Sequence, residues 1–158
     1  MRATRSDPSM LEFDVDIASR WPLCDQGRHF DLGHILSSAV IDTISPSRPG
    51  DLGVQHAGLW ECDLLDSSLI WSGGVYDMFG LERELPITRE QALAHYTEDS
   101  RARLERLRSD AIRHKSGFTV DVEIRAAAVG QMRKVRLIGA PVYAGELAVR
   151  LHGLKLII

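Results

Sequence analysis

The residues that could do chemistry are scattered along the chain and form none of the constellations that catalysis usually needs. There is no Gly-x-Ser-x-Gly elbow, phosphate-cradling glycine loop, His-Glu-x-x-His or Cys-x-x-Cys. Ser72 precedes two glycines, which predicts a strand end and not an activated nucleophile. Asp63 and Asp66 flank a predicted turn, where Asp commonly caps the backbone or faces water. We therefore expect no enzyme activity, no catalytic residue and no metal site.

Two other functions stay open. The first is a small α+β pocket enzyme, such as an isomerase, which would need a buried carboxylate of raised pKa. Asp63 or Glu123 would have to point into an apolar cavity, whereas most acids here alternate outward on predicted strands or lie on helix faces. The second is a carrier of an apolar ligand that has no protein partner.

The bulk composition argues against nucleic acid and membrane as partners. A net charge of −3 does not favour a nucleic-acid binder, and the basic residues of the predicted long helix alternate with acids. No apolar segment is long enough to span a bilayer, and no apolar stretch of a secretory signal follows Arg2 and Arg5. Cys24 and Cys62 are too few for a disulfide framework and are expected to be free thiols. We expect a cytoplasmic protein.

A break at Pro46, Pro49 and Gly50 divides the chain into a flanking segment, residues 1–50, and a domain, residues 51–158. Alternation over residues 11–17 predicts a half-buried strand in the flanking segment. About 50 residues are too few for a stable core of their own, so the segment should dock on the main domain or on a second copy of the chain. Its apolar residues are candidates for a homodimer interface, and they are Phe13, Val15 and Trp21.

The domain has a clear order of predicted elements. Strands are expected at residues 59–64, 69–72, 118–125, 132–143 and 147–158, and helices lie between the second strand and the third. Thr88 and Gln91 form a capping-box pattern, and Thr97 is expected to cap the long helix. The apolar phase of the last strand slips at Gly153, which predicts a bulge or bend there. The order predicts an α+β fold, a five-stranded antiparallel sheet with helices on one face.

Short motifs in this order resemble those of the PAS domain family, including its PAC-like C-terminal strands. The first hairpin carries a Gly-x-Trp-x-x-Asp pattern and a Trp-Ser pair, the next helix ends in Phe-Gly, and Tyr-Thr-Glu-Asp stands where the family has a His-Pro-Glu-Asp-like signature. The last strands carry glycines and an Arg-Leu pair. The residues concerned are Gly58, Trp60, Asp63, Trp71, Ser72, Phe79, Gly80, Tyr96, Thr97, Glu98, Asp99, Gly139, Pro141, Gly145, Arg150, Leu151 and Gly153.

The resemblance covers residues 56–158 and implies a module that binds small molecules, partner proteins or itself. Such modules commonly signal to a histidine kinase, a cyclic-dinucleotide enzyme or a transcription factor. We therefore expect a non-enzymatic signal-sensing or protein-interaction module of a bacterial-type pathway, such as a two-component system. A homodimer is expected, with a histidine kinase or another signalling protein as its partner.

The resemblance also sets expectations about cofactors. Flavin photochemistry is rejected, because Cys62 lies on a strand and not in a helical Asn-Cys-Arg-Phe-like stretch, and Cys24 lies outside the domain. Haem is not expected, since its axial ligand would have to be His95 or His114. A small apolar ligand could bind between the helices and the sheet, although the same residues could simply form the core. The candidates are Trp71, Met78, Phe79, Tyr96, Val120, Val122 and Leu137.

Overall fold

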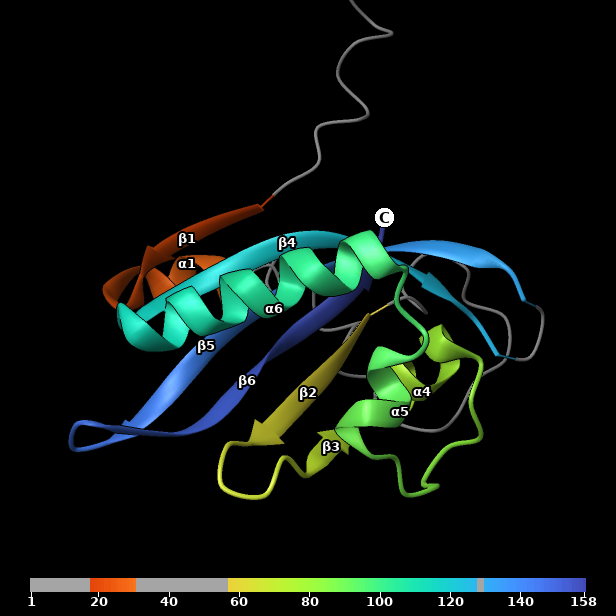
Figure 1. The fold of residues 1–158 in the computed structure, drawn as a ribbon, viewed down its shortest axis with the longest axis horizontal. Helices are drawn as coiled ribbons and strands as arrows, with labels where there is room; N and C mark the ends of the chain where they lie inside the picture. The colour runs from red at the N-terminus through yellow and green to blue at the C-terminus, as the bar shows by residue number, and fades with distance from the viewer. Residues whose placement is uncertain (1–17, 31–56, 128–129) are drawn as a thin grey trace, which may run out of the picture.

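The computed structural model describes residues 18–30, 57–127 and 130–158, and these form one antiparallel sheet with helices packed against it (Figure 1). The strands are β1 (Ala18–Pro22), β2 (Ala57–Asp63), β3 (Leu69–Trp71), β4 (Ser116–Arg125), β5 (Met132–Ala144) and β6 (Leu147–Ile157). They lie side by side in the order β1-β4-β5-β6-β2-β3. The α+β class and the antiparallel sheet expected from the sequence are confirmed.

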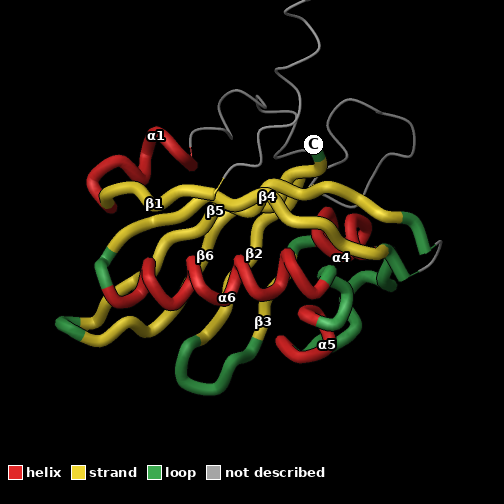
Figure 2. The backbone as a smooth tube through the Cα atoms, turned by 45° about the horizontal axis from the view of Figure 1, so that its top comes forward, coloured by secondary structure: helices red, strands yellow, loops and turns green. Residues whose placement is uncertain are grey.

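The helices divide between the two faces of this sheet. A 3-10 turn η2 (Leu23–Asp25) and α1 (Gln26–Phe30) follow β1, whereas α4 (Gly73–Phe79), α5 (Arg89–Leu93) and α6 (Glu98–Arg113) separate β3 from β4. Figure 2 shows α6 running along one side of the sheet and α1 on the other. None of the helices in the described ranges is long and apolar enough to cross a membrane.

The sheet has six strands where the sequence predicted five, and the additional strand is β1. It pairs antiparallel with β4, with Trp21 opposite Gly117. A Cβ atom at Gly117 would lie 2.1 Å from the Trp21 ring, so only glycine leaves room for the indole there. The strand expected at residues 11–17, which carries Phe13 and Val15, lies outside the described residues.

The predicted helix starts are confirmed in atomic detail. The Thr88 hydroxyl accepts a hydrogen bond from the Gln91 backbone N–H, and the Gln91 side chain accepts one from the Thr88 N–H, which completes the capping box of α5. The Thr97 hydroxyl accepts from the Ser100 N–H at the start of α6. These caps fix the ends of the two helices that cover the inner face of the sheet.

The bulge predicted at Gly153 is wrong. Gly153 pairs regularly with Gly139 on β5 and with Trp60 on β2, and the irregularity of β6 lies further back along the strand. Val142 pairs with Arg150 and Tyr143 with Ala148, which leaves the extra residue at Val149. The apolar phase shifts after Gly153 because β6 is covered on both faces: Leu151 belongs to the core on the helical side, and Leu154 and Leu156 to the cluster on the other side.

Candidate ligand-binding site

A row of residues across the inner face of the sheet combines two glycines with three large rings. The backbone register places Phe118, Gly139, Gly153, Trp60 and Trp71 at one level of five neighbouring strands. A Cβ at Gly139 would lie 2.7 Å from the Phe118 ring and 2.8 Å from the Trp60 ring, so both rings occupy space that a side chain would fill. The Phe118 and Trp60 rings therefore cover Gly139 on the inner face of the sheet.

A cavity of about 60 Å³ lies between the sheet and the helices, and Phe118, Trp60 and Trp71 contribute to its lining. Its lining is mostly apolar and aromatic, with a few polar side chains from β6, α5 and α6. The lining residues are Trp60, Cys62, Leu69, Trp71, Arg89, Ala92, Leu93, Tyr96, Leu104, Glu105, Arg108, Phe118, Leu137, Leu151 and Lys155. An apolar cavity with few convergent polar groups is what small-molecule sites in proteins usually look like.

The amine of Lys155 projects from the middle of the sheet into this cavity. The residue is 4% exposed, and its Nζ donates a hydrogen bond to the Tyr96 hydroxyl at 3.1 Å. Nζ also lies 4.8 Å from the ring centroids of Trp71 and Phe79 and 5.8 Å from those of Trp60 and Tyr96. Four aromatic faces within about 6 Å are a setting in which ring quadrupoles attract an ammonium.

Tyr96 is held in place by the chain that joins α5 to α6. Its neighbours pair with the end of β4, because the Arg125 N–H donates to the His95 carbonyl at 2.8 Å and the Thr97 N–H donates to the Glu123 carbonyl at 3.0 Å. Tyr96 itself forms an isolated antiparallel bridge with β4. The hydroxyl that meets Lys155 is therefore fixed by backbone hydrogen bonds on both sides.

Burial shifts the ionisation of the polar groups in the cavity. It lowers the pKa of Lys155 from 10.5 to about 7, and the effect of Cys62 opposes this only partly. It raises the pKa of the Tyr96 hydroxyl well above its usual range and also raises that of the Cys62 thiol. Near neutral pH the tyrosine and the cysteine are thus uncharged, while Lys155 exchanges between ammonium and amine.

A second set of charges lies where the helices approach solvent. Arg89 of α5 and Glu105 of α6 are partly exposed and form an ion pair that ties the two helices together. Arg108 lies one turn further along α6 and lowers the pKa of the Cys62 thiol, against the larger effect of burial. These side chains form the polar side of a cavity whose floor is apolar.

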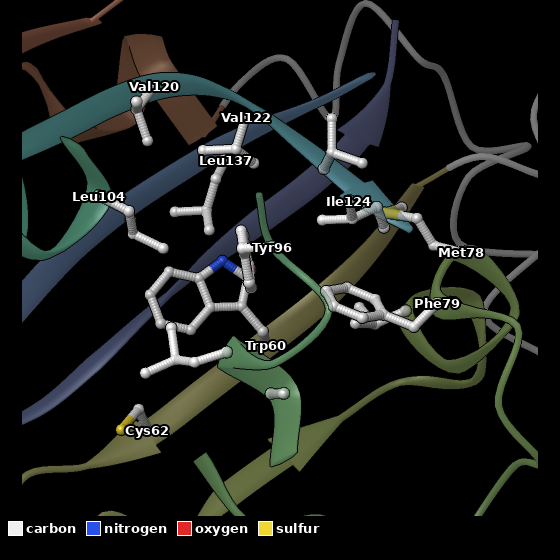
Figure 3. Packing of buried hydrophobic residues seen from close by; sticks show 14 of the residues in the cluster. Trp60, Cys62, Met78, Phe79, Tyr96, Leu104, Val120, Val122, Ile124 and Leu137 are labelled. Atoms are coloured by element: carbon white, nitrogen blue, oxygen red, sulfur yellow. The ribbon is translucent and has the colours of Figure 1, made fainter. Parts of the chain in front are cut away.

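The structure separates the residues predicted to line a pocket into two groups. Trp71, Tyr96 and Leu137 line the cavity, and the Phe79 ring lies against the Lys155 amine. Met78, Val120 and Val122 are buried in the same core cluster and are not among the lining residues. Figure 3 shows side chains of both groups in this cluster. Whether a ligand occupies the cavity stays a prediction.

Lys155 was missed by the sequence reasoning, although a signal for it was present. Leu151, Gly153 and Lys155 alternate along β6 on the inner face, so a strand without a bulge at Gly153 puts the lysine inside. A bulge at Gly153 would instead turn Leu154 and Leu156 inward and Lys155 outward. The polar groups at the helices, Arg89 and Arg108, were also missed, because Arg108 was interpreted as part of a solvated face and Arg89 lies on a short helix without a long periodic pattern.

The residues raised for enzymatic or haem chemistry lie elsewhere. Glu123 is exposed, and the Asp63 carboxylate accepts a hydrogen bond from the Leu65 N–H at 2.7 Å in the turn after β2. His95 Nδ1 lies 3.0 Å from the Arg125 carbonyl, and His114 is the exposed C-cap of α6. Within the described ranges, no group of three or more His, Cys, Asp or Glu residues is placed to hold a metal ion.

Trp21, a predicted dimer-interface residue, is buried within its own chain. It is 5% exposed, its indole N–H donates to the Thr119 hydroxyl at 3.1 Å, and its ring stacks on His29 at 4.0 Å. Phe30 packs edge-on against the His152 ring at 5.0 Å. The segment after β1 thus covers part of the outer face of the sheet, where a second cluster of buried residues lies.

Comparison with known proteins identifies the fold of the chain. No protein-family model and no curated protein sequence matches the chain. The structure is similar to a sensory box histidine kinase/response regulator from Burkholderia thailandensis, with 23% identity, a TM-score of 0.56, and coverage of 65% of this chain and 76% of that one. It is also similar to a domain of a putative light and redox sensing histidine kinase from Haloarcula marismortui, with 18% identity, a TM-score of 0.56, and coverage of 76% and 97%.

A third similar structure is a fungal LOV domain photoreceptor, with 19% identity, a TM-score of 0.50, and coverage of 85% of this chain and 99% of that one. All three are sensor proteins by their titles. The chain has the PAS fold, as the motifs along its sequence indicated.

Proposed function

We propose that this chain is a signal-sensing PAS domain that detects a small molecule in the cavity over β6 and passes the signal to another protein without catalysing a reaction. The observation that carries the proposal is the cavity itself, a mostly apolar space whose lining includes one buried amine. A side chain whose ionisation is strongly perturbed inside a cavity marks a candidate functional site. The sensor titles of proteins with the same fold support the same role.

The proposal includes a homodimer and a histidine kinase or another signalling protein as partner, as in a two-component system. One similar structure is described as a histidine kinase/response regulator. The proposal also includes a cytoplasmic location, because both cysteines of the chain are free, and free thiols persist in a reducing compartment. The predicted interface residues Phe13 and Val15 precede β1 in the sequence.

Native mass spectrometry of the full chain, purified under non-denaturing conditions, tests both parts of the proposal. We expect a dimer that carries additional mass lost on denaturation, because a ligand in the cavity would be held non-covalently. A chain without additional mass, whose thermal stability no small molecule in a metabolite library alters, would contradict the ligand-sensing role.

Removing residues 1–17 tests the dimer without disturbing the sheet, since β1 begins at Ala18. We expect this truncation to yield a monomer with the melting temperature of the full chain. The matched control removes residues 1–56 and with them Trp21, which should uncover the outer cluster and cause aggregation. An unchanged dimer after removal of residues 1–17 would show that Phe13 and Val15 are not the interface.

A further inference from the structure

The Lys155 amine occupies an unusual position for a charged group, because nothing anionic faces it from the described part of the chain. Its hydrogen-bond partner there is the neutral Tyr96 hydroxyl. Glu105, the carboxylate among the cavity-lining residues, forms an ion pair with Arg89. A buried ammonium is costly unless an anion and enough acceptors surround it. The cavity lining therefore carries an amine that no negative charge of the described residues matches.

The donors of the amine can be counted against the acceptors around it. An ammonium carries three N–H donors and no acceptor. Tyr96 takes one, and the remaining N–H groups face aromatic rings, which attract the charge but accept no conventional hydrogen bond. The Tyr96 O–H can still donate, since its oxygen already accepts from Lys155. One carboxylate placed beside these two groups would satisfy donors from both.

The size of the cavity limits what such an anion can be. At roughly 10–15 Å³ per water, a volume of about 60 Å³ corresponds to about four to six waters. A molecule with about as many non-hydrogen atoms fits, which is the range from acetate to butyrate. The rest of the wall near the amine is apolar and includes Trp60, Phe118 and Leu137, which suits a short hydrocarbon tail.

We propose that the cavity binds a short-chain monocarboxylate, whose carboxylate is held by the Lys155 ammonium and the Tyr96 hydroxyl while its alkyl end lies against the aromatic wall. This inference rests on the proposed function, because it names the chemical class of the molecule that the domain senses. A single ammonium among the aromatic rings favours one negative charge. The ion pair with Glu105 neutralises Arg89, and Arg108, the other arginine in the lining, acts on the Cys62 thiol.

The site also predicts how binding depends on pH. The titratable groups that line the cavity with Lys155 are few: the Cys62 thiol on β2, the Tyr96 hydroxyl, and the charged side chains of Arg89, Glu105 and Arg108 on the helices. A carboxylate binds the ammonium form, and above about pH 7 the neutral amine must take up a proton before the anion binds. Affinity should therefore fall by up to about tenfold for each pH unit above that point.

The test is a titration of the full-length protein with sodium propionate, followed by the indole N–H signals of the tryptophans in two-dimensional NMR. Propionamide is the matched neutral probe, because it has the same shape and lacks the charge. We expect propionate to bind at least about tenfold more tightly than propionamide, the usual advantage of a charge-assisted hydrogen bond. Equal affinities, or no saturable shift with propionate, would overturn the inference without any variant being needed.

Two variants locate the binding site on the protein. Lys155→Met keeps the length of the side chain and removes the charge, so propionate binding should drop to the level of propionamide. Lys115→Met removes an exposed lysine that is paired with Glu146 and does not line the cavity. This variant should bind propionate as the wild type does. Tyr96→Phe should weaken propionate binding while leaving propionamide binding less affected. Equal loss in Lys115→Met would mean that propionate binds to the protein surface.

The result separates this inference from the proposed function. If native mass spectrometry finds a bound molecule without a carboxylate, the sensory role stands and the monocarboxylate assignment fails. If propionate binds at Lys155 but leaves the oligomeric state and partner binding unchanged, the site stands and the signalling role fails.

Discussion

Replacing Lys155 by methionine should make the folded protein more stable at neutral and acidic pH. Burial lowers the pKa of this amine from 10.5 to about 7, and at about 1.4 kcal/mol per pH unit the difference corresponds to about 5 kcal/mol. This is the approximate cost of keeping the ammonium inside the fold. Methionine loses the hydrogen bond to Tyr96 and the ring contacts, so the expected net gain is smaller, about 1–4 kcal/mol near pH 6.

The sign of the pH dependence follows from which state binds the proton. Below about pH 7 both the folded and the unfolded chain carry the charge, and the full cost is present. Between about 7 and 10.5 the unfolded chain binds a proton that the folded chain does not, so the wild type gains stability as pH rises. The advantage of Lys155→Met should therefore shrink by about 2 kcal/mol between about pH 7 and 8.5.

Urea denaturation of the two proteins, followed by tryptophan fluorescence at several pH values, measures this difference directly. The measured pH range should end below about pH 9. Because burial raises the pKa of Cys62, the thiol ionises in the unfolded chain before it does so in the folded chain. This lowers the stability of both proteins as pH rises. Lys115→Met is the control, and removal of its exposed ion pair should change stability by less than about 1 kcal/mol. A stability gap between wild type and Lys155→Met that stays constant across this pH range would refute the reasoning.

Three further changes test the fold around the site. In Gly153→Ala the new Cβ would lie 1.8 Å from the Ile138 carbonyl oxygen, so we expect a loss of more than about 3 kcal/mol or no folded protein by circular dichroism. Trp21→Ala should cost about 3–5 kcal/mol in chemical denaturation, since it empties a buried indole site and leaves the Thr119 hydroxyl without its donor. Thr88→Ala should cost about 1 kcal/mol and lower the melting temperature by about 2–4 °C, whereas Thr88→Ser should restore most of it.

The sequence predicted the domain from residue 57 onward well because local signals there agree with each other. Apolar and polar residues alternate along β4, and the caps at Thr88 and Thr97 mark the helix starts. Strand β1 was harder to predict because it is short and held by tertiary contacts. Its pairing depends on one indole that fits over Gly117, nearly a hundred residues away, and nothing in the local pattern reports that contact.

The interior lysine could not be predicted from residue type, and the reason is physical. Lys is almost never fully buried, so any rule based on average burial places Lys155 on the surface. Its burial depends on rings from three separate stretches of chain, represented by Trp71, Phe79 and Tyr96, that meet only in the folded state. The alternation of residues along β6 did indicate an inward-facing Lys155. Because both faces of β6 are covered, its apolar pattern changes phase at Gly153, and this change predicted a bulge that the strand does not have.

The cost of the buried charge would link binding of the proposed anion to the stability of this domain. In the folded chain Lys155 is either neutralised or held as an ammonium by rings and one hydroxyl. An anion at that point would raise the pKa of the amine, and its binding would stabilise the folded protein by an amount set by its concentration and affinity. That gain would be transmitted through Tyr96, because its neighbours connect α5 and α6 to the end of β4. A sensor needs such a coupling, since a ligand shifts a conformational equilibrium only by the difference in its affinity for the two states.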